Sequence, residues 1–399
     1  MNSTLYLTRN GLLEPLGQSQ IMAYLRGLSQ EYRITLITYE KDDDWSDTER
    51  VARVRTECES LGIRWLPQRF RPRPKIVAPL FSMVRMVWLV RREVQKHNVQ
   101  LIHARSYIPA AVAMLVGRLA GIPFIFDMRA LWPEELITAG RLGRGSLLHR
   151  AIVTAERVCI SRAAAVVSLT HAALAHLNSE YPYGMAEQKV VVIPTCADLE
   201  RFVPVEDGPE RRIIGCLGTV LSGWFRLDWL VSFMTVAADR DPEASFELTT
   251  RDDPVQIRAA IENSSSLVKS RLEIRSCSSD LVQEVLQGQM ASVMFYAGGE
   301  LSELGRSPTR MAEILGCGVP VVSNEGVGDV AEIIKQYNVG VLVDNCSEEA
   351  MVKALDELDT LLSDPKLSSR CRKAAEEVFS LQAGTESYRE IYRELLPHS

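Results

Sequence analysis

Short runs of apolar, β-branched residues alternate with longer stretches of helical periodicity along the whole chain. Parallel sheets covered by helices on both faces have this pattern, because a strand buried on both sides reads as a continuous apolar run. The strands expected in the first half are 4–8, 33–38, 63–66, 100–104, 122–127, 164–169 and 189–193. Those expected in the second half are 212–217, 245–249, 272–275, 291–296, 319–323 and 339–343. The sequence therefore predicts the α/β class, with one doubly wound domain in each half.

The domain boundaries follow from length and composition. At 399 residues the chain exceeds the size at which one core keeps growing, so two domains of roughly 200 residues are expected. The segment 204–210 is polar, contains two prolines and a glycine, and indicates a linker. We therefore expect domains at 1–203 and 204–381. The tail 382–399 has a helical pattern, and we expect it to cross back to the first domain.

Charge and cysteine usage exclude several functional classes. The net charge is -6, with 45 basic and 51 acidic residues, so no overall field favours nucleic acid. The eight cysteines never form a Cys-x-x-Cys pair, which is typical of a reducing compartment. The start of the chain lacks the features of a secretory signal. The most apolar stretch, 76–90, is interrupted by Arg85 and is too short to span a bilayer. We expect a cytoplasmic protein.

One predicted helix in the second half begins with groups suited to an anion. Ser307 suits the N-cap and Pro308 suits the first helical position, so the N–H groups that follow can face a diphosphate. Arg310 adds a permanent positive charge. Glu313 lies four residues beyond Thr309, roughly 6 Å further along the same face, where a ribose would meet its carboxylate. An ordinary capped surface helix is the alternative, because Ser-Pro caps are common.

The loop after the first strand contains two glycines, Gly11 and Gly17, before the next helix starts. Glycine permits close approach of the backbone to a ligand. In open α/β sheets, ligands bind at the carboxyl ends of strands, so this loop is a candidate binding segment. A plain strand-to-helix turn is an equally good interpretation.

Polar and aromatic side chains gather after two neighbouring strands of the first half. His103 and Arg105 close the fourth strand, and Asp127 and Arg129 follow the fifth, ahead of the segment 132–135. Because parallel strands end at the same edge of a sheet, these groups are expected to lie close together. A single histidine at a strand end is more often a satisfied structural residue than a catalyst, so both interpretations of His103 stay open.

Taken in order, these segments resemble the retaining glycosyltransferases of family 4. The segments that support the resemblance are Leu16–Gln20, Ile102–Ser106, Arg129–Glu135, Val192–Phe202 and Ser307–Pro320. The resemblance covers nearly the whole chain. It implies two Rossmann-like domains facing a central cleft, the GT-B fold. It also implies a nucleotide-diphosphate sugar held by the second domain, an acceptor hydroxyl presented by the first, and transfer with retained anomeric configuration.

The resemblance and the residues together give a set of candidate site residues. The catalytic candidates are Arg129, Asp127 and His103. The donor-binding candidates are Gly17, Gly218, Thr219, Arg226, Ser307, Thr309, Arg310 and Glu313. The acceptor-side candidates are Gln18, Trp132 and Glu134. Arg129 is expected to stabilise the donor phosphate or orient the sugar, and Asp127 or Glu134 to position substrate hydroxyls.

No cofactor and no metal ion are expected. No Asp-x-Asp pair follows a strand; Asp42–Asp44 precedes a helix and indicates a solvated turn. Retention without an evident nucleophile then suggests same-face transfer, in which the departing phosphate accepts the proton of the acceptor. Preorganised cations and N–H dipoles would stabilise the charge on that leaving group.

The chain departs from the family pattern at the first of two glutamates. Glu313 matches the second, ribose-binding member, but Gly305 stands where the first is expected. Glu303 and Glu300 are the nearby carboxylates that could substitute for it. Backbone amides are the other candidates.

Two further departures concern positively charged groups. Many members carry an Arg and a Lys after the first strand of the second domain, where this chain has 218–226. Arg226 and Arg310 are the available replacements. The histidine of many relatives corresponds to Arg129, which stays protonated and cannot act as a general base.

The segment 67–97 is strongly basic within an acidic chain. It carries one acid, Glu93, and eight basic residues: Arg69, Arg71, Arg73, Lys75, Arg85, Arg91, Arg92 and Lys96. Apolar side chains are interleaved with them. Such a segment can rest at an anionic membrane surface that presents a lipid-linked or other glycan acceptor. A core-packed helix with a solvated basic face is the competing interpretation.

Three other functions are alternatives to a glycosyltransferase. Residues 326–331 match the loose Gly-x-Gly-x-x-Ala form of a dinucleotide fingerprint, which would make the chain an NAD-dependent dehydrogenase. That match falls late in the second domain rather than at its first strand-helix turn. A nucleotide-sugar epimerase would share the donor grip but need no acceptor. A non-catalytic scaffold would explain the missing phosphate cations.

Overall fold

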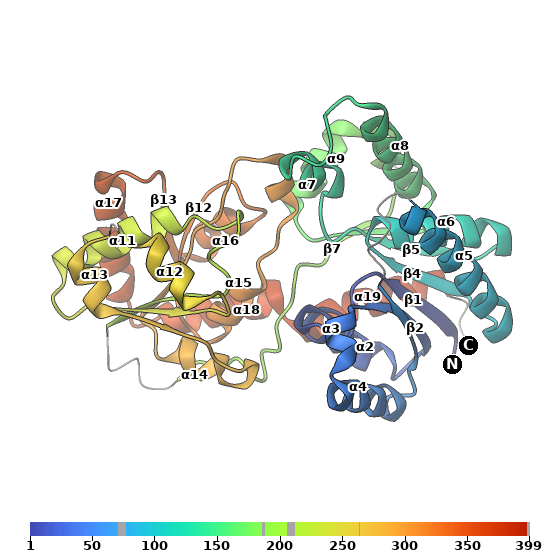
Figure 1. Ribbon diagram of the computed structural model, residues 1–399, viewed down its shortest axis with the longest axis horizontal. Helices are drawn as coiled ribbons and strands as arrows, with labels where there is room; N and C mark the ends of the chain where they lie inside the picture. The colour runs from blue at the N-terminus through green and yellow to red at the C-terminus, as the bar shows by residue number, and fades with distance from the viewer. Residues whose placement is uncertain (71–76, 186–187, 206–211, 263, 397–399) are drawn as a thin grey trace. The chain divides into compact units, whose positions relative to one another are not determined.

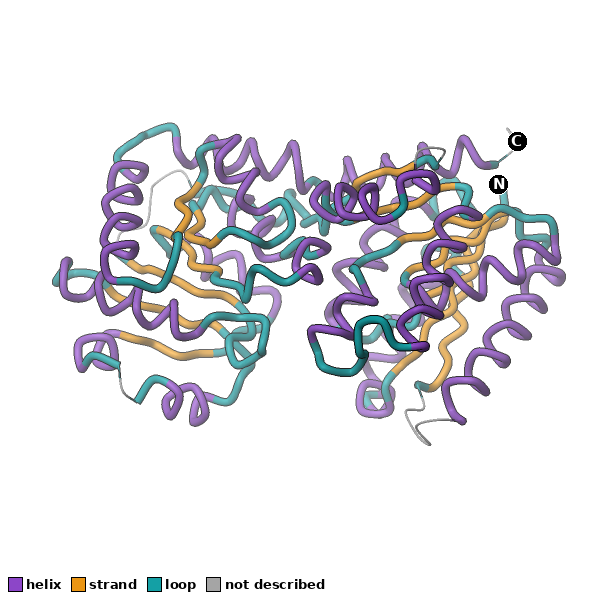
Figure 2. The backbone as a smooth tube through the Cα atoms, turned by 90° about the horizontal axis from the view of Figure 1, so that it is seen from above, coloured by secondary structure: helices purple, strands orange, loops and turns teal. Residues whose placement is uncertain are grey.

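The computed structural model describes residues 1–70, 77–185, 188–205, 212–262 and 264–396. The chain forms two compact units (Figure 1). The first unit comprises Met1–Pro194 together with Leu381–Ser399, and the second comprises Thr195–Ser380. Each unit contains one sheet, and helices lie on both faces of each sheet (Figure 2).

The sheet of the first unit has seven parallel strands in the order β3-β2-β1-β4-β5-β6-β7. Its strands are β1 Ser3–Thr8, β2 Arg33–Glu40, β3 Arg64–Arg69, β4 Leu101–Arg105, β5 Phe124–Asp127, β6 Ala165–Ser168 and β7 Val190–Val192. The strand order reverses between β1 and β4. Their carboxyl ends are therefore the place where a ligand is expected in a doubly wound sheet.

The helices of the first unit connect these strands and cover the sheet. They are α1 Pro15–Gly17, the π-helix Gln18–Met22, α2 Ala23–Leu28, α3 Asp42–Ser46, α4 Thr48–Ser60, α5 Val77–His97, α6 Tyr107–Ala120, α7 Trp132–Thr138, α8 Leu147–Arg162, α9 His171–Glu180, α10 Pro182–Met185 and α19 Leu381–Leu395. The last of them, α19, packs against α2. The expectation of a solvated turn at Asp42–Asp44 was wrong. These acids open α3, where negative charge is favoured at a helix start.

The sheet of the second unit has six parallel strands in the order β10-β9-β8-β11-β12-β13. Its strands are β8 Ile213–Leu217, β9 Ser245–Thr249, β10 Leu272–Arg275, β11 Ala291–Met294, β12 Val321–Asn324 and β13 Gly340–Val343. Here the order reverses between β8 and β11.

The helices of the second unit are again placed between successive strands. They are α11 Leu227–Arg240, α12 Pro254–Ala260, α13 Ser266–Arg271, the 3₁₀ turn Ser279–Leu281, α14 Val282–Gln287, the 3₁₀ turn Leu301–Gly305, α15 Thr309–Gly316, α16 Val330–Tyr337, α17 Glu348–Leu362 and α18 Leu367–Phe379. The two units together confirm the α/β class and the doubly wound organisation of both halves.

The segment between the two sheets belongs to the second unit from Thr195 onward. The N–H of Ala197 donates to the carbonyl of Phe379 at 2.9 Å, and Arg372 Nη1 donates to the carbonyl of Phe202 at 2.6 Å. These bonds tie the segment to α18. The linker expected at 204–210 falls largely on 206–211, which lie outside the described residues.

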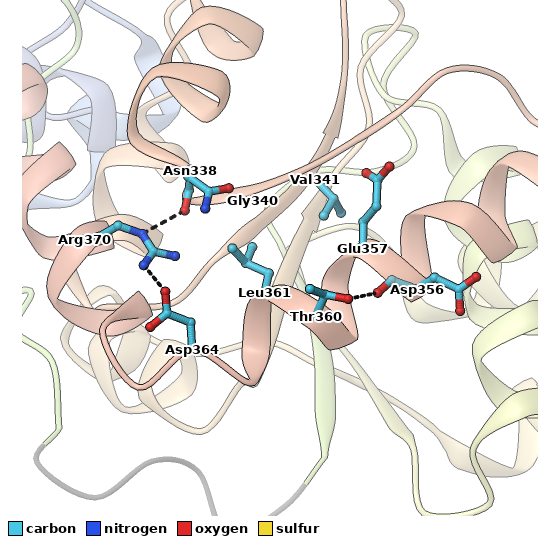
Figure 3. A pocket seen from close by; sticks show the side chains of 9 residues that line it. All are labelled: Asn338, Gly340, Val341, Asp356, Glu357, Thr360, Leu361, Asp364 and Arg370. Atoms are coloured by element: carbon cyan, nitrogen blue, oxygen red, sulfur yellow. Dashed lines mark hydrogen bonds and ion pairs between the residues drawn. The ribbon is translucent and has the colours of Figure 1, made fainter.

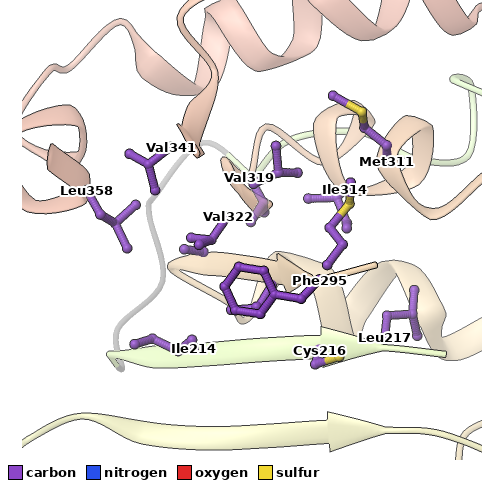
Figure 4. Packing of buried hydrophobic residues seen from close by; sticks show 14 of the residues in the cluster. Ile214, Cys216, Leu217, Phe295, Met311, Ile314, Val319, Val322, Val341 and Leu358 are labelled. Atoms are coloured by element: carbon purple, nitrogen blue, oxygen red, sulfur yellow. The ribbon is translucent and has the colours of Figure 1, made fainter. Parts of the chain in front are cut away.

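The core of the second unit fixes the orientation of α15. Met311 and Ile314 are fully buried and belong to the same apolar cluster as Cys216, Phe295 and Val322 (Figure 4). Because side chains three and four residues apart share one helix face, burial of these two directs the other face of α15 away from the core.

Candidate functional site

Helix α15 begins one residue later than the sequence predicts. Pro308 occupies the N-cap, and no side chain caps the helix. The hydroxyl of Ser307 instead accepts the N–H of Thr195 at 3.1 Å, and Thr195 Oγ1 donates to the carbonyl of Ser307 at 2.6 Å. The expectation of Ser307 as N-cap and Pro308 as the first helical residue was therefore wrong. The N–H groups of Thr309 and Arg310 now open the helix, where no carbonyl of the same helix can accept them.

Arg310 lies against the loop that follows β8. Gly218 has a φ of +100°, and a Cβ built on it would lie 2.5 Å from Arg310 Nη2. The guanidinium carbon also lies 5.6 Å from the ring centroid of Tyr296. Nη1 of Arg310 is buried and has no hydrogen-bond partner among the described residues. A buried guanidinium nitrogen without an acceptor is unfavourable unless an anion completes it.

Glu313 lies one turn further along α15 and is partly buried. Its carboxylate forms no hydrogen bond or ion pair within the described part of the chain. Burial raises the pKa of Glu313 to about 7, and the charges of Arg201 and Arg310 only partly oppose that rise. The carboxylate oxygens are therefore available to accept hydroxyl groups of a ligand.

The topology brings Gly218, Arg310 and Glu313 together. Gly218 directly follows β8, α15 follows β11, and these two strands are neighbours at the point where the strand order reverses. This edge of a doubly wound sheet is where ligands bind. The second unit thus presents helix N–H groups, a free guanidinium donor and a free carboxylate at its expected ligand edge.

The other donor-binding candidates of the second unit differ in position. Thr219 is exposed in the loop after β8, which Asp252 holds by accepting the N–H groups of residues 220 and 221 at 2.7 and 3.0 Å. Arg226 donates to Asp228 at 3.1 and 2.8 Å. Its guanidinium is paired within the first turn of α11, whereas the sequence predicted a guanidinium available to the diphosphate.

The carboxylates considered as substitutes for the missing glutamate also differ. Glu303 is fully buried and accepts Arg306 Nε and Nη2 at 2.7 and 3.1 Å. Burial raises the pKa of Glu303, and the Arg306 charge opposes that effect. Glu300 is exposed. Glu303 is therefore paired with Arg306, and Glu300 differs from Glu313 in being exposed.

The loop after β1 is held by a residue that the sequence did not reveal. Glu40, the last residue of β2, is fully buried and accepts the N–H groups of Leu12 and Leu13 at 2.9 and 3.1 Å. A Cβ on Gly17 would lie 2.1 Å from the carbonyl oxygen of Gly11, so only glycine fits there. Gln18 Nε2 donates to the carbonyl of residue 12 at 2.7 Å. The donor candidate Gly17 and the acceptor-side candidate Gln18 both belong to the first unit. The signal in the sequence that could have identified Glu40 is an acidic residue at the end of an apolar strand.

The three catalytic candidates lie together at the carboxyl ends of β4 and β5. Oδ2 of Asp127 lies 3.4 Å from His103 Nε2 and 3.5 Å from Arg105 Nη1, and Oδ1 lies 3.6 Å from Arg129 Nη1. Burial opposes ionisation of Asp127, but the charge of Arg129 and the contacts with His103 and Arg105 hold its pKa far below the usual range. Burial lowers the pKa of His103, so its ring is neutral at pH 7.

Two tyrosines of α19 complete this cluster. Tyr388 donates its hydroxyl to Asp127 at 3.1 Å, and the Tyr392 hydroxyl lies 2.9 Å from His103 Nδ1. Burial raises the pKa of both phenols well above the usual value. Both ring nitrogens of His103 are therefore engaged. Sequence reasoning missed these partners, although their i,i+4 spacing marks one helix face.

Arg129 is the member of the cluster that reaches solvent. It has a positive φ of 49°, which is uncommon for a residue other than glycine and is found at functional sites. Its side chain is 10 % exposed, and Nη2 donates to Gln20 at 3.4 Å. Burial would lower the pKa of this guanidinium, but the charge of Asp127 raises it, so Arg129 stays charged.

The two remaining acceptor-side candidates lie on α7. The ring of Trp132 lies 5.5 Å from that of Tyr107, and Glu134 pairs with Arg144 at 3.1 Å. Within the described residues, neither side chain forms a hydrogen bond, ion pair or ring contact with the cluster around Asp127. In the described residues, no group of three His, Cys, Asp or Glu side chains is arranged to hold a metal ion.

A groove of about 620 Å³ in the second unit lies away from the ligand edge of its sheet (Figure 3). It lies beside Gly340, where β13 begins, and so at the opposite end of the strand from the ligand edge. Its charged groups are already paired: Asp356 contacts Arg240 at 2.6 Å, and Arg370 pairs with Asp364.

The basic segment is only partly described. Arg71, Arg73 and Lys75 lie outside the described residues, and Arg69 pairs with Asp42 at 2.7 Å. Along α5 the exposed face carries apolar and basic groups: Val84, Arg85, Trp88, Arg91, Arg92 and Lys96. Among the described helices, none has the length and apolar character needed to cross a bilayer.

Comparison with known proteins defines the class first. Residues 18–196 match the family described as "Glycosyl transferase 4-like domain", and residues 289–378 match "Glycosyl transferases group 1". A glycosyltransferase from Rickettsia africae has a similar solved structure, with a TM-score of 0.71 at 16% identity over 100% of this chain and 99% of that one. Curated protein sequences give no significant match.

Two further solved structures share the fold. Sucrose-phosphate synthase from Thermosynechococcus elongatus gives a TM-score of 0.68 at 14% identity, covering 99% of each chain. HepE from Anabaena, solved in complex with UDP-glucose, gives 0.67 at 15% identity over 98% of this chain and 99% of that one. The chain belongs to the family-4 glycosyltransferases with the GT-B fold. Both family matches support a glycosyltransferase instead of the NAD-dependent dehydrogenase considered as an alternative.

Proposed function

We propose that this glycosyltransferase moves a sugar from a nucleotide-diphosphate donor to a hydroxyl of a glycan or lipid-linked precursor, with retention of anomeric configuration and without a metal ion. The observation that carries the donor assignment is the pair of unused groups on α15: a buried Nη1 of Arg310 and the unpaired carboxylate of Glu313. The comparison with HepE, whose structure contains UDP-glucose, supports a nucleotide sugar as donor.

In the second unit, the diphosphate meets the N–H groups of Thr309 and Arg310, with Ser307 and Thr195 fixing the entry to the helix. Gly218 keeps the loop after β8 close to the Arg310 guanidinium. Glu313 accepts the two ribose hydroxyls. The same donors stabilise the negative charge that develops on the leaving nucleoside diphosphate.

In the first unit, the proposed catalytic residues divide into one that meets substrate and two that support it. Arg129 supplies a permanent positive charge to the reacting substrates. Asp127 and His103 hold that guanidinium and the end of β5 in place. The acceptor approaches on the side of Gln18 and Trp132. Because Arg129 cannot take a proton, the departing phosphate accepts the proton of the acceptor hydroxyl.

The donor assignment is tested by calorimetry of nucleoside diphosphate binding. Arg310→Ala and Glu313→Ala should each weaken binding about tenfold or more, since hydrogen bonds to charged groups are worth roughly 1.5–3 kcal/mol. Arg258→Ala and Glu284→Ala, which remove exposed charges elsewhere in the second unit, are the matched controls. Unchanged affinity in both α15 variants would mean that the grip is misassigned.

Membrane presentation of the acceptor is the second part of the proposal. Val84 and Trp88 on α5 are 61 % and 59 % exposed, beside the exposed Arg91 and Lys96. Apolar side chains flanked by basic ones fit an anionic lipid surface. Sedimentation with vesicles containing acidic phospholipid should occur at low salt and be lost after reversal of the Arg91 and Lys96 charges. No sedimentation of the unaltered protein would remove this part.

A further inference from the structure

The cluster at the ends of β4 and β5 has a charge that its own residues do not balance. We propose that this cluster is an oxyanion site in the first unit, which binds an anionic group carried by the acceptor substrate. The inference rests on the proposed function in one respect, because that function gives the diphosphate of the donor to the second unit.

Two guanidinium groups in this cluster share one carboxylate. Arg105 and Arg129 both face Asp127, with side chains that are 4 % and 10 % exposed. The neighbouring His103 is neutral, and the tyrosines around the cluster stay protonated because burial raises each phenol pKa. Asp127 is the carboxylate that acts on both guanidiniums in the described structure. One positive charge therefore lacks a counter-ion in a mostly buried position, which is unfavourable unless an anion completes it.

The cluster also has unused hydrogen-bond donors. Nε of Arg105 and Nε of Arg129 are buried and have no hydrogen-bond partner among the described residues. Oδ1 of Asp127 likewise has no hydrogen-bond partner among the described residues. Buried polar groups are normally satisfied, so two unsatisfied guanidinium nitrogens beside a single unsatisfied carboxylate oxygen point to an absent partner. Guanidinium groups bind phosphate and carboxylate oxygens with matching planar geometry.

The position of the cluster explains how a substrate reaches it. Arg105 and Asp127 are paired in register at the ends of β4 and β5, on the ligand edge of the sheet. Arg129 follows immediately, and its left-handed backbone places a partly exposed guanidinium beside the buried pair. A purely structural ion cluster would need neither the backbone strain nor the excess charge.

The acceptor is the better source of the anion than the nucleotide. The second unit already offers the diphosphate a helix start and the unpaired Arg310. A separate positive site in the first unit therefore fits a second anionic group, such as a phosphate or a carboxylate on the acceptor. A neutral acceptor would leave the charge of Arg129 uncompensated throughout the reaction.

The test uses soluble probes that separate the possible sources. Octyl phosphate, methyl glucuronide and the uncharged octyl glucoside are titrated calorimetrically into full-length Arg310→Ala, in which the grip of the second unit is weakened. The double variant Arg310→Ala, Arg129→Gln should bind the charged probe about tenfold to a hundredfold more weakly than Arg310→Ala alone, because a charge-assisted pair is lost. Arg129→Lys should restore part of the affinity. Arg150→Gln, which removes an exposed arginine of α8, should change nothing.

Separate readouts distinguish failure of this inference from failure of the donor assignment. The Arg129 Nε–H signal in NMR spectra of the unaltered protein should shift with octyl phosphate or methyl glucuronide and not with octyl glucoside. This measurement does not depend on whether a variant folds. Whichever charged probe binds more tightly names the class of acceptor group. Three results would each overturn the inference: no binding of either charged probe, equal binding after Arg129→Gln, or a loss of affinity for nucleoside diphosphate that matches the loss for octyl phosphate.

Discussion

Glu313→Gln should change the pH dependence of stability in a direction fixed by the environment of this carboxyl group. Burial raises its pKa from 4.5 to about 7 in the folded chain. A raised carboxyl pKa means that the folded state holds the proton more tightly than the unfolded state. Folding stability is therefore unaffected by this group below about pH 4.5, falls as the pH rises towards 7, and is constant above it.

The magnitude follows from the size of the shift. A rise from 4.5 to about 7 is roughly 2.5 units, and each unit corresponds to about 1.4 kcal/mol, so ionised Glu313 costs the unliganded protein about 3 kcal/mol. Glutamine cannot ionise and removes this cost. The free energy of unfolding of Glu313→Gln, relative to that of the unaltered chain, should therefore increase by about 3 kcal/mol from pH 4.5 to pH 8.

Urea denaturation of both proteins across this pH range measures the difference directly. Glu284→Gln, at an exposed carboxylate of α14, serves as the control and should show no such trend. A difference between Glu313→Gln and the unaltered chain that stays flat with pH would refute the reasoning. It would mean that Glu313 has a partner or is solvated, and is not held ready for a ligand.

Three further substitutions probe the elements that support the two sites. Gly218→Ala should destabilise the protein by about 1 to 3 kcal/mol and weaken nucleoside diphosphate binding, because Gly218 has a φ of +100° and the added Cβ would clash with the Arg310 guanidinium. Gly223→Ala is the control, because a Cβ there has nothing within 4 Å. Equal melting temperatures of the two variants would contradict this prediction. Tyr388→Phe should lower the free energy of unfolding by about 1 to 3 kcal/mol, since a buried carboxylate of β5 loses a hydroxyl donor, and denaturation that matches the parent protein would count against the cluster. Thr195→Val removes both side-chain bonds to Ser307 and should weaken nucleoside diphosphate binding severalfold by loosening the start of α15; unaltered calorimetry would show that this contact does not position the helix.

The arrangement of strands was accessible from the sequence because buried parallel strands carry a local apolar signal. Each expected strand has a counterpart, and the largest shift at a carboxyl end is at β3, which runs to Arg69 rather than ending at residue 66. The polar Gln68 and Arg69 of this edge strand carry no apolar signal, yet they pair with β2. Their pairing depends on a neighbouring strand that a local pattern does not contain.

The site was accessible only in part, because its partners come from distant segments. The sequence identified Arg310 and Glu313 on one helix, and the structure places Arg310 against Gly218 at the ligand edge, with Glu313 one turn further along the helix. The local preference of serine assigned Ser307 to the N-cap, whereas in the folded chain the hydroxyl of Ser307 accepts the N–H of Thr195. Long-range partners such as Tyr388 leave no signal near the residues that they contact.

The most direct measurement of the central claim is a crystal structure of the protein with a bound nucleoside diphosphate. We expect phosphate oxygens within hydrogen-bond distance of the N–H groups of Thr309 and Arg310, a contact to Arg310 Nη1, and both ribose hydroxyls on the Glu313 carboxylate. A nucleotide bound elsewhere, with Arg310 Nη1 and Glu313 still unpaired, would contradict the assignment of the donor site.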